Sequence, residues 1–338
     1  MVVENLIIRD LYENAITAND AGVDYDNITI RNNEIYNTLG TGECIYFGCQ
    51  STNTTYTSCQ VHHSIIENNY CHDTCMGGGV TTPSCTGGSM GSGIFFFSNF
   101  FFFLNFFFTL KGYQVKMGSY SNIVRNNVCN NTFGPCLLLY DDYNKGVNII
   151  EGNLVLNNNR DSGIQISAGA IIRNNIVVNS NLSGINIPSN SVNLYNGLPN
   201  RNLVIEHNTL VSNNEYGIRF GVTPVNTTIR NNAVLGNLLG DFRSVSQSGV
   251  LWSRNAYNTG STPSNVNANG TFLVGTVSSQ FASPSSNNFY PLSSGNLVAA
   301  GSESGLPYDF NYFARSACAP TGFYYFFIIF IKCYFSNN

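Results

Sequence analysis

A short β-strand pattern that ends in paired asparagines recurs along most of the chain, and it constrains the fold more than any other feature. Apolar and polar residues alternate within each copy at period two, which is typical of strands with one buried face. The closest copies are 22 to 26 residues apart, which suits one coil of a solenoid and is too short for a propeller blade. The copies are DNITIRNNEIYNT (26–38), HSIIENNYCHDT (63–74), SNIVRNNVCNNT (121–132), VNIIEGNLVLNN (147–158), AIIRNNIVVNS (170–180), NLVIEHNTLVSN (202–213) and TTIRNNAVLGN (227–237).

A second repeated strand lies between these copies, in segments such as GYQVKMG, GPCLLLYDD, SGIQISAG and YGIRFGV. The Ile and Val positions are expected to point inward and to stack on the coils above and below. The paired Asn side chains can bond to their equivalents in neighbouring coils, and Asn tolerates the left-handed backbone of a tight corner. The pattern therefore predicts an all-β, right-handed parallel β-helix (a β-solenoid) over residues 1–241.

The segment NITIRNNEIYNT and its relatives resemble the repeat of the pectin-lyase-like superfamily, over roughly residues 3 to 241. This resemblance implies the same right-handed β-helix. The motif is specific for the fold and says little about the reaction, because one fold hosts many chemistries.

Three segments depart from the repeat. Residues 94–112 form a Phe-rich run that interrupts a strand the repeat requires, because the flanking residues match DSGIQISAGAIIRNN once the run is removed. A membrane span is rejected, since one crossing would leave the two flanks on opposite sides of the bilayer. A second Phe-rich run forms the tail, 323–338, and both are interpreted as translated intervening sequence. Residues 242–322 are rich in Ser, Asn and Gly and are expected to form an irregular segment that covers the C-terminal end of the stack.

Composition makes nucleic acid an unlikely partner and favours an extracellular setting. Only 10% of residues are charged and the net charge is −4, so there is no basic footprint for nucleic acid. Ten cysteines, six of them within residues 44–85, and six N-x-S/T sequons favour an oxidising, secreted setting. Met1 to Leu11 shows no signal peptide, so either the chain is not secreted or this sequence lacks its true beginning. We expect a monomer.

Candidate site residues emerge when the second strands are aligned. Inward positions include Tyr113 and Val115, and one outward column then holds Tyr46, Gln114, Leu138, Gln165, Asn186 and Arg219. A parallel column holds Gly48, Lys116, Tyr140, Ser167, Pro188 and Gly221. Such a face could bind an extended polysaccharide, with Gln114, Gln165, Asn186 and Arg219 as substrate contacts. Lys116 and Tyr140 are expected to lie one coil apart, at about 4.8 Å.

Lys116 and Tyr140 suggest cleavage of a uronic acid polymer by β-elimination, with the lysine as base and the tyrosine as proton donor. YQVKMGSYSNIVRNN also resembles the strand that bears the base lysine in the chondroitinase-B and alginate-lyase-like β-helix family, and Lys116 matches that lysine. The family's partner arginine in the next coil is absent, because LLLYDDYNKG places Tyr140 at or near its position. The alternative is a solvated lysine beside a packing tyrosine.

Asp141 and Asp142 are the other catalytic candidates. Paired carboxylates serve glycoside hydrolysis, and they are also candidate ligands for a hard cation such as calcium. Adjacent strand residues point in opposite directions, so the two could cooperate only in a turn, which DDYNKG predicts. A turn without catalytic function is the alternative.

The histidines offer no metal motif in the sequence. His62, His63 and His72 lie near Cys59, Cys71 and Cys75, but no spacing matches a zinc site. Disulfides in a long early loop, with pairings unknown, are the preferred interpretation. The candidate residues as a whole leave two function classes open. One is a polysaccharide-binding protein with lyase or hydrolase activity, and the other is a non-catalytic glycan-binding or scaffold β-helix.

Overall fold

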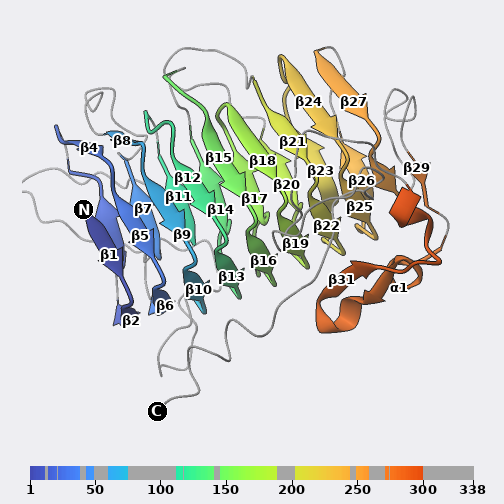
Figure 1. Ribbon diagram of the computed structural model, residues 1–338, viewed down its shortest axis with the longest axis horizontal. Coiled ribbons are helices and arrows are strands. Elements are labelled where there is room, and N and C mark those ends of the chain that lie inside the picture. The colour runs from blue at the N-terminus through green and yellow to red at the C-terminus, as the bar shows by residue number, and fades with distance from the viewer. Residues whose placement is uncertain are drawn as a thin grey trace, which may run out of the picture.

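The protein is a right-handed parallel β-helix whose coils follow one another in sequence order along the long axis (Figure 1). The computed structural model describes residues 1–11, 14–20, 22–38, 43–48, 60–74, 112–116, 118–140, 145–188, 202–243, 249–258, 271–273 and 275–299. The Phe-rich segments 94–111 and 323–338 lie outside these ranges. Within the same ranges, no helix is long and apolar enough to cross a membrane.

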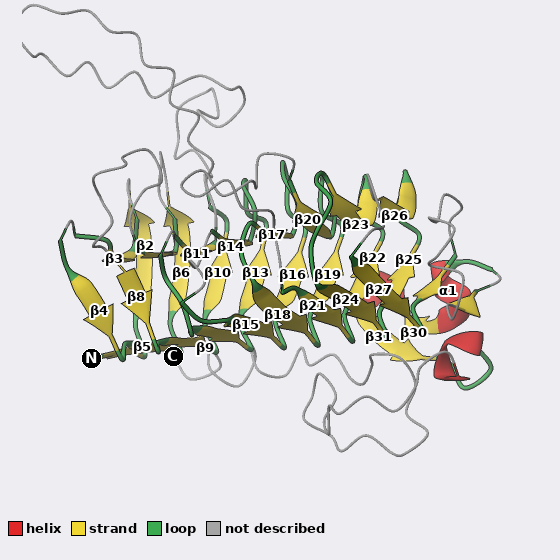
Figure 2. Ribbon diagram, turned by 90° about the horizontal axis from the view of Figure 1, so that it is seen from above, coloured by secondary structure: helices red, strands yellow, loops and turns green. Residues whose placement is uncertain are grey.

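Three parallel sheets form the walls of the helix among the described residues, and Figure 2 shows them from above. Sheet A consists of β1 (Val2–Glu4), β5 (Thr29–Arg31), β9 (Ile65–Glu67), β12 (Ile123–Arg125), β15 (Asn148–Glu151), β18 (Ala170–Arg173), β21 (Val204–Glu206), β24 (Thr227–Arg230) and β27 (Val250–Ser253). Sheet B consists of β2 (Ile7–Leu11), β6 (Glu34–Thr38), β10 (Tyr70–His72), β13 (Val128–Asn130), β16 (Leu154–Leu156), β19 (Ile176–Val178), β22 (Thr209–Val211), β25 (Ala233–Leu235), β28 (Ala256–Tyr257) and β29 (Thr271–Phe272). Sheet C consists of β3 (Ile16–Ala18), β7 (Ile45–Phe47), β11 (Tyr113–Val115), β14 (Leu137–Leu139), β17 (Ile164–Ile166), β20 (Ile185–Ile187), β23 (Tyr216–Phe220) and β26 (Gly240–Arg243).

The remaining elements are short. Strands β4 (Asp24–Asp26) and β8 (Gln60–His62) pair in parallel beside the first coils. The C-terminal elements are α1 (Val277–Gln280), the antiparallel strands β30 (Phe281–Ser283) and β31 (Asn288–Pro291), and the 3-10 helices Pro284–Ser286 and Asn296–Ala299.

The corner between sheets A and B explains the Asn-Asn motif. Its first residue takes a positive φ, as Asn126 does at 56° and Asn174 does at 53°. The second is a buried Asn whose Oδ1 accepts bonds from the backbone N–H and the Nδ2 of its equivalent in the preceding coil. The ladder runs through Asn33, Asn69, Asn127, Asn153, Asn175, Asn208, Asn232 and Asn255. The amide stack predicted from the sequence is therefore confirmed.

A second ladder, of charges, runs along the outer side of sheet A. The coil-to-coil register alternates the sign at every step through Glu4, Arg31, Glu67, Arg125, Glu151, Arg173, Glu206 and Arg230. Four pairs in this ladder form ion pairs, including Arg125–Glu67 and Arg173–Glu151, each with a shortest N–O distance of 2.7 Å. Each charge thus has an opposite charge in at least one adjacent coil.

The solenoid interior is filled by the inward aliphatic and aromatic side chains, among them Val115 and Tyr113, as predicted. Two disulfides lie in the same core. Cys44–Cys71 links the start of β7 to β10, and Cys129–Cys136 links β13 to the start of β14. Disulfides were expected in a long early loop around Cys59, Cys71 and Cys75. This is wrong for Cys71, because it lies on strand β10 with its side chain in the core, and Cys59 and Cys75 lie outside the described residues.

The parallel sheets extend beyond residue 241, where the sequence repeat had suggested an end. Strand β27 pairs with β24, and β28 and β29 continue sheet B. The described part of the following segment packs Phe281, Phe289 and Leu297 against the outer residues of sheet B, such as Leu235. Figure 1 places α1 and β31 at the end of the molecule opposite the N-terminus.

We predict that Asn153→Ala lowers the free energy of unfolding by about 2 to 4 kcal/mol. The change removes the acceptor of Asn127 and the donor to the Val124 carbonyl, and these buried groups would then lack their partners. Urea-induced unfolding followed by circular dichroism measures the change.

Glu151→Gln, two residues away on the same coil, is the control. Glu151 is half-buried and pairs with Arg173 in the charge ladder, so its loss should cost less than about 1 kcal/mol. Equal losses in the two variants would contradict the role given to the asparagine ladder.

Candidate functional site

The outer side of sheet C carries the residues that the sequence aligned into a column. Register pairs join Tyr46 to Gln114, Gln114 to Leu138, Leu138 to Gln165, Gln165 to Asn186 and Asn186 to Arg219. The same register continues to Arg243 on β26. The alignment of the second strands was therefore correct across six coils.

Lys116 lies directly after β11, between two aromatic rings from the neighbouring coils. Its backbone N–H donates to the Phe47 carbonyl at 2.7 Å, and the Tyr140 N–H donates to the Val115 carbonyl at 2.9 Å. These bonds bring Nζ to 4.6 Å from the ring centre of Tyr140 and 5.2 Å from that of Tyr46. Lys116 and Tyr140 are thus neighbours, as the repeat predicted.

Gly48 makes room for this lysine. It has a φ of 86°, and a Cβ at this position would lie 3.2 Å from the Lys116 Cβ and 2.5 Å from the Ser119 Oγ. Both the left-handed backbone and the close approach favour glycine. The absence of a side chain at Gly48 therefore lets this segment pack closely against Lys116.

The expectation of an open column is wrong at several positions. Gln114 is 0% exposed, Asn186 5% and Lys116 6%, and Leu138 is also buried. Sequence periodicity gives the side of the sheet to which a residue points, but it does not show what covers that side. Gln165, Arg219 and Tyr140 remain partly exposed.

A buried carboxylate, which the sequence did not single out, lies beside this site. Glu43 precedes β7 and accepts a hydrogen bond from the Gln114 Nε2. The only sequence signal is an acidic residue two positions before the apolar strand β7. Gln114 therefore holds an acidic group at the site.

The two phenols of the site keep their protons. Burial raises the pKa of Tyr46 well above its ordinary value, with a further contribution from the Glu43 charge. Burial also raises the pKa of Tyr140, and the charges of Asp161 and Glu43 add to this. At neutral pH both hydroxyls are therefore donors rather than bases.

Arginines occupy the other end of the column. The Arg219 Nη1 lies 3.6 Å from the Glu215 Oε2, and the Arg243 guanidinium lies 5.5 Å from the ring centre of Tyr216. The Asn186 Oδ1 and the Arg219 Nε, on neighbouring coils, are buried without a hydrogen-bond partner among the described residues. This end combines two cationic groups with polar atoms that the fold leaves unsatisfied.

The other candidates lie apart from this site or outside the described residues. Asp141 and Asp142 are outside the described ranges, so the hydrolase and hard-cation hypotheses stay predictions. His72 stacks on Tyr36 and Tyr70 and contacts Glu34 and Asp73 through its two ring nitrogens. The pair His62–His63 lies on a different strand from His72, β8 and its end.

No protein-family model matches the sequence, and no curated protein matches it either. Among solved structures, XylC in complex with xylose has a TM-score of 0.48 and 11% identity, and the match covers 96% of this chain and 65% of that one. An alginate lyase of the PL6 family, AlyGC, has a TM-score of 0.37 and 16% identity, with 95% and 54% covered. The A-module of the mannuronan C-5 epimerase AlgE6 of Azotobacter vinelandii has a TM-score of 0.31 and 12% identity, with 79% of each chain covered. The chain spans between half and two thirds of the first two structures, and the parallel β-helix assignment rests on its own strand register.

We predict that Gln114→Ala lowers the free energy of unfolding by about 1 to 3 kcal/mol, because the buried Glu43 loses a donor. Gln165→Ala is the control, since Gln165 lies in the same column but is partly exposed, and it should change stability by less than about 0.5 kcal/mol. Thermal unfolding of both variants measures the difference, and similar shifts would contradict the role of Gln114.

We also predict that alkaline pH destabilises the protein partly through Tyr46. The folded state raises the pKa of this phenol, so the unfolded state loses the proton first as pH rises above about 10. Ionisation of Tyr46 therefore leaves the free energy of unfolding unchanged below that pH and lowers it as the pH rises further. Tyr46→Phe should flatten the fall between pH 10 and 11 and leave the slope between pH 6 and 8 unchanged. Parallel curves over the whole range would be the contrary result.

Proposed function

We propose that the protein binds an extracellular acidic polysaccharide along the outer side of sheet C and cleaves it by β-elimination. The observation that carries the proposal is the position of Lys116, whose Nζ lies between the rings of Tyr46 and Tyr140 on that side. The two core disulfides support an extracellular setting, because such bonds persist in oxidising compartments.

The direction of the column favours a linear polymer. Its positions follow the helix axis at about 4.8 Å per coil. A chain that follows the axis meets Lys116 near one end, then Gln165, and then Arg219 and Arg243 at the other end. The guanidinium groups of Arg219 and Arg243 suit a polymer with carboxylates, and the partly exposed guanidinium of Arg219 suits a carboxylate through paired donors.

The proposed elimination assigns its proton transfers to Lys116, acting as the neutral amine, and to Tyr140. The Lys116 Nζ takes the proton from C5 of a uronate, the bond from C4 to the bridging oxygen breaks, and a C4–C5 double bond forms. The Tyr140 hydroxyl gives its proton to the leaving oxygen, and its raised pKa keeps that proton available at neutral pH. The proton taken up by Lys116, whose Nζ lies 4.6 Å from the centre of the Tyr140 ring, returns to the phenolate through solvent and restores both groups.

Neutralisation of the uronate carboxylate is the remaining requirement. Arg219 lies four coils from Gln114 in the register, about 19 Å away, which is too far to serve the reacting sugar. A calcium ion held near Asp141 and Asp142, which follow Tyr140 directly, would supply this charge. We therefore propose that the activity depends on calcium.

Binding without cleavage is the second candidate function. It is favoured by the burial of Lys116, which is 6% exposed and packs against two rings as a structural lysine would. In that case Gln165, Arg219 and Arg243 would hold the glycan on a rigid scaffold.

The test incubates the protein with alginate, chondroitin, pectin and glucuronan, with and without calcium, and follows the ultraviolet absorbance of the unsaturated product. We expect one substrate to respond, and we expect Lys116→Ala and Tyr140→Phe to lose the activity. Lys145→Ala is the matched control, because this lysine also lies over a tyrosine ring, at 5.7 Å from Tyr120.

Gel retardation with the same polymers separates the two functions. Retardation that weakens in Arg219→Ala, without any absorbance change, would leave binding as the function. A flat absorbance trace together with unretarded migration would contradict both.

A further inference from the structure

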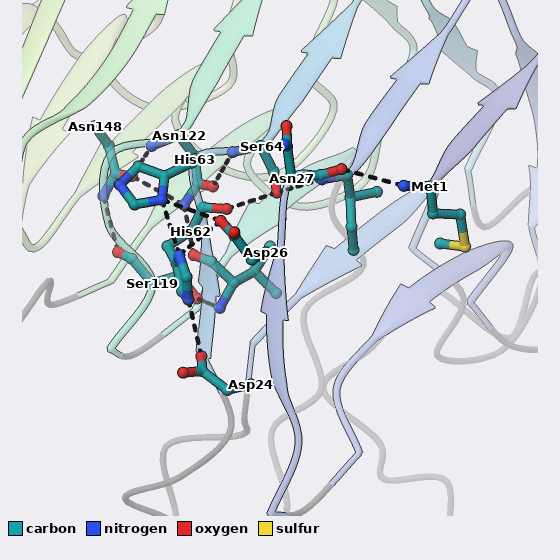
Figure 3. A network of polar contacts seen from close by, with 12 residues as sticks. Met1, Asp24, Asp26, Asn27, His62, His63, Ser64, Ser119, Asn122 and Asn148 are labelled. Carbon is teal, nitrogen blue, oxygen red and sulfur yellow. Dashed lines mark hydrogen bonds and ion pairs between the residues drawn. The ribbon is translucent and has the colours of Figure 1, made fainter.

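A cluster of metal-ligating side chains lies on the first coils, apart from the lysine site. Strands β4 and β8 pair in parallel, and their register places Asp26 opposite His62 and Asp24 opposite Gln60. Figure 3 shows Asp24 and Asp26 beside His62. His63 follows at the end of β8. The pairing joins an acidic residue of one coil to histidines of the next.

The backbone at His63 directs both histidines to the same place. Adjacent strand residues normally point in opposite directions. His63 instead occupies a left-handed corner with a φ of 48°, at the position where neighbouring coils have Asn27 and Ser121. The His62 and His63 rings therefore meet, with both Nδ1 atoms directed toward the Asp26 carboxylate (Figure 3).

Three atoms form a triangle with equal sides. The His62 Nδ1, the His63 Nδ1 and the Asp26 Oδ1 are each 3.0 Å from the other two. Two ligands that are each about 2.1 Å from one ion and at right angles to each other lie ~3.0 Å apart, and ~3.4 Å at the tetrahedral angle. The triangle thus has the size of one face of a metal coordination shell.

The three contacts of the triangle cannot all be hydrogen bonds at once. An ionised carboxylate contributes no proton, and each ring nitrogen contributes at most one. If both nitrogens donate to Asp26, their own 3.0 Å contact places two donors together, and any other arrangement leaves two lone pairs facing each other. A cation at the centre of the triangle accepts a lone pair from all three atoms at once.

The surroundings of His62 match those of a metal ligand. Its other ring nitrogen, Nε2, lies 3.2 Å from the Asp24 Oδ1, which fixes the tautomer that leaves Nδ1 free to ligate. Its ring also stacks on Tyr120 of the next coil, with centroids 5.0 Å apart and planes 12° apart. The ring is therefore held from two sides, and its side chain is only 14% exposed.

We propose that Asp26, His62 and His63 bind a divalent transition metal ion such as Zn²⁺, with Asp24 as the carboxylate that orients His62. Two imidazoles and one carboxylate suit zinc and its neighbours better than calcium, which prefers oxygen ligands alone. The exposed side chains of His63 and Asp26, at 60% and 56%, leave the remaining coordination positions open to water. Because Asp26 and the histidines come from different coils, the ion clips these coils together and stabilises the folded state.

The test titrates Zn²⁺ into the metal-free full-length protein by calorimetry and measures the thermal midpoint with and without the ion. We expect one bound equivalent assigned to this site and a higher midpoint with Zn²⁺. His63→Asn, which suits the left-handed corner, and Asp26→Asn should lose this equivalent and the midpoint shift while folding normally by circular dichroism. Asp24→Asn should weaken binding by about 10- to 100-fold.

His72→Gln is the matched control, because His72 also contacts two carboxylates but lies outside the triangle. It should bind Zn²⁺ as the unchanged protein does, and Co²⁺ should give a visible spectrum typical of nitrogen and oxygen ligands without thiolate. Zinc binding that persists in His63→Asn, or that shows thiolate absorption with Co²⁺, would assign the ion to cysteines and overturn the proposal. A titration without binding heat and without a midpoint shift would overturn it equally.

Discussion

The buried asparagine at each corner between sheets A and B is the interaction on which the rest of the structure depends. A parallel solenoid has no hairpin turns to set the register of neighbouring strands, so another contact must set it. Here the Oδ1 of one Asn accepts two bonds from the Asn of the preceding coil, and this contact recurs from Asn33 to Asn255. The preceding residue supplies the left-handed turn that directs this amide inward.

Both proposed sites follow from this register. Lys116 lies beside Tyr140, and Asp26 beside His62, because equivalent residues of adjacent coils are held about 4.8 Å apart. The two residues of each pair come from different coils, so no short sequence motif contains both. In such a fold, one site combines residues of neighbouring coils, which are separated in the sequence by whole repeats.

The sequence predicted the coil, the inward residues and the position of Tyr140 beside Lys116, because period-two alternation and repeat alignment contain that information. It did not predict that the Tyr46 ring also contacts this lysine. It did not predict that Gln114 and Asn186 are buried, because coverage depends on contacts outside the coil. The end of the solenoid was placed too early because Arg254 takes the left-handed position where most coils have Asn or Gly, which hides the motif around Asn255. The meeting of His62 and His63 depends on the corner at residue 63, which strand alternation alone does not show.

The alternating charges of sheet A repeat with a period of two coils along the solenoid. Because Glu and Arg exchange places at each step from Glu4 to Arg230, a strand displaced by one coil would face a like charge, while a displacement by two coils would restore every pair. Loss or duplication of a single coil within this stretch would similarly place two glutamates or two arginines in contact. The ladder therefore favours growth of the stack in pairs of coils, and it opposes misthreading by one coil even though each of its half-exposed ion pairs adds little stability.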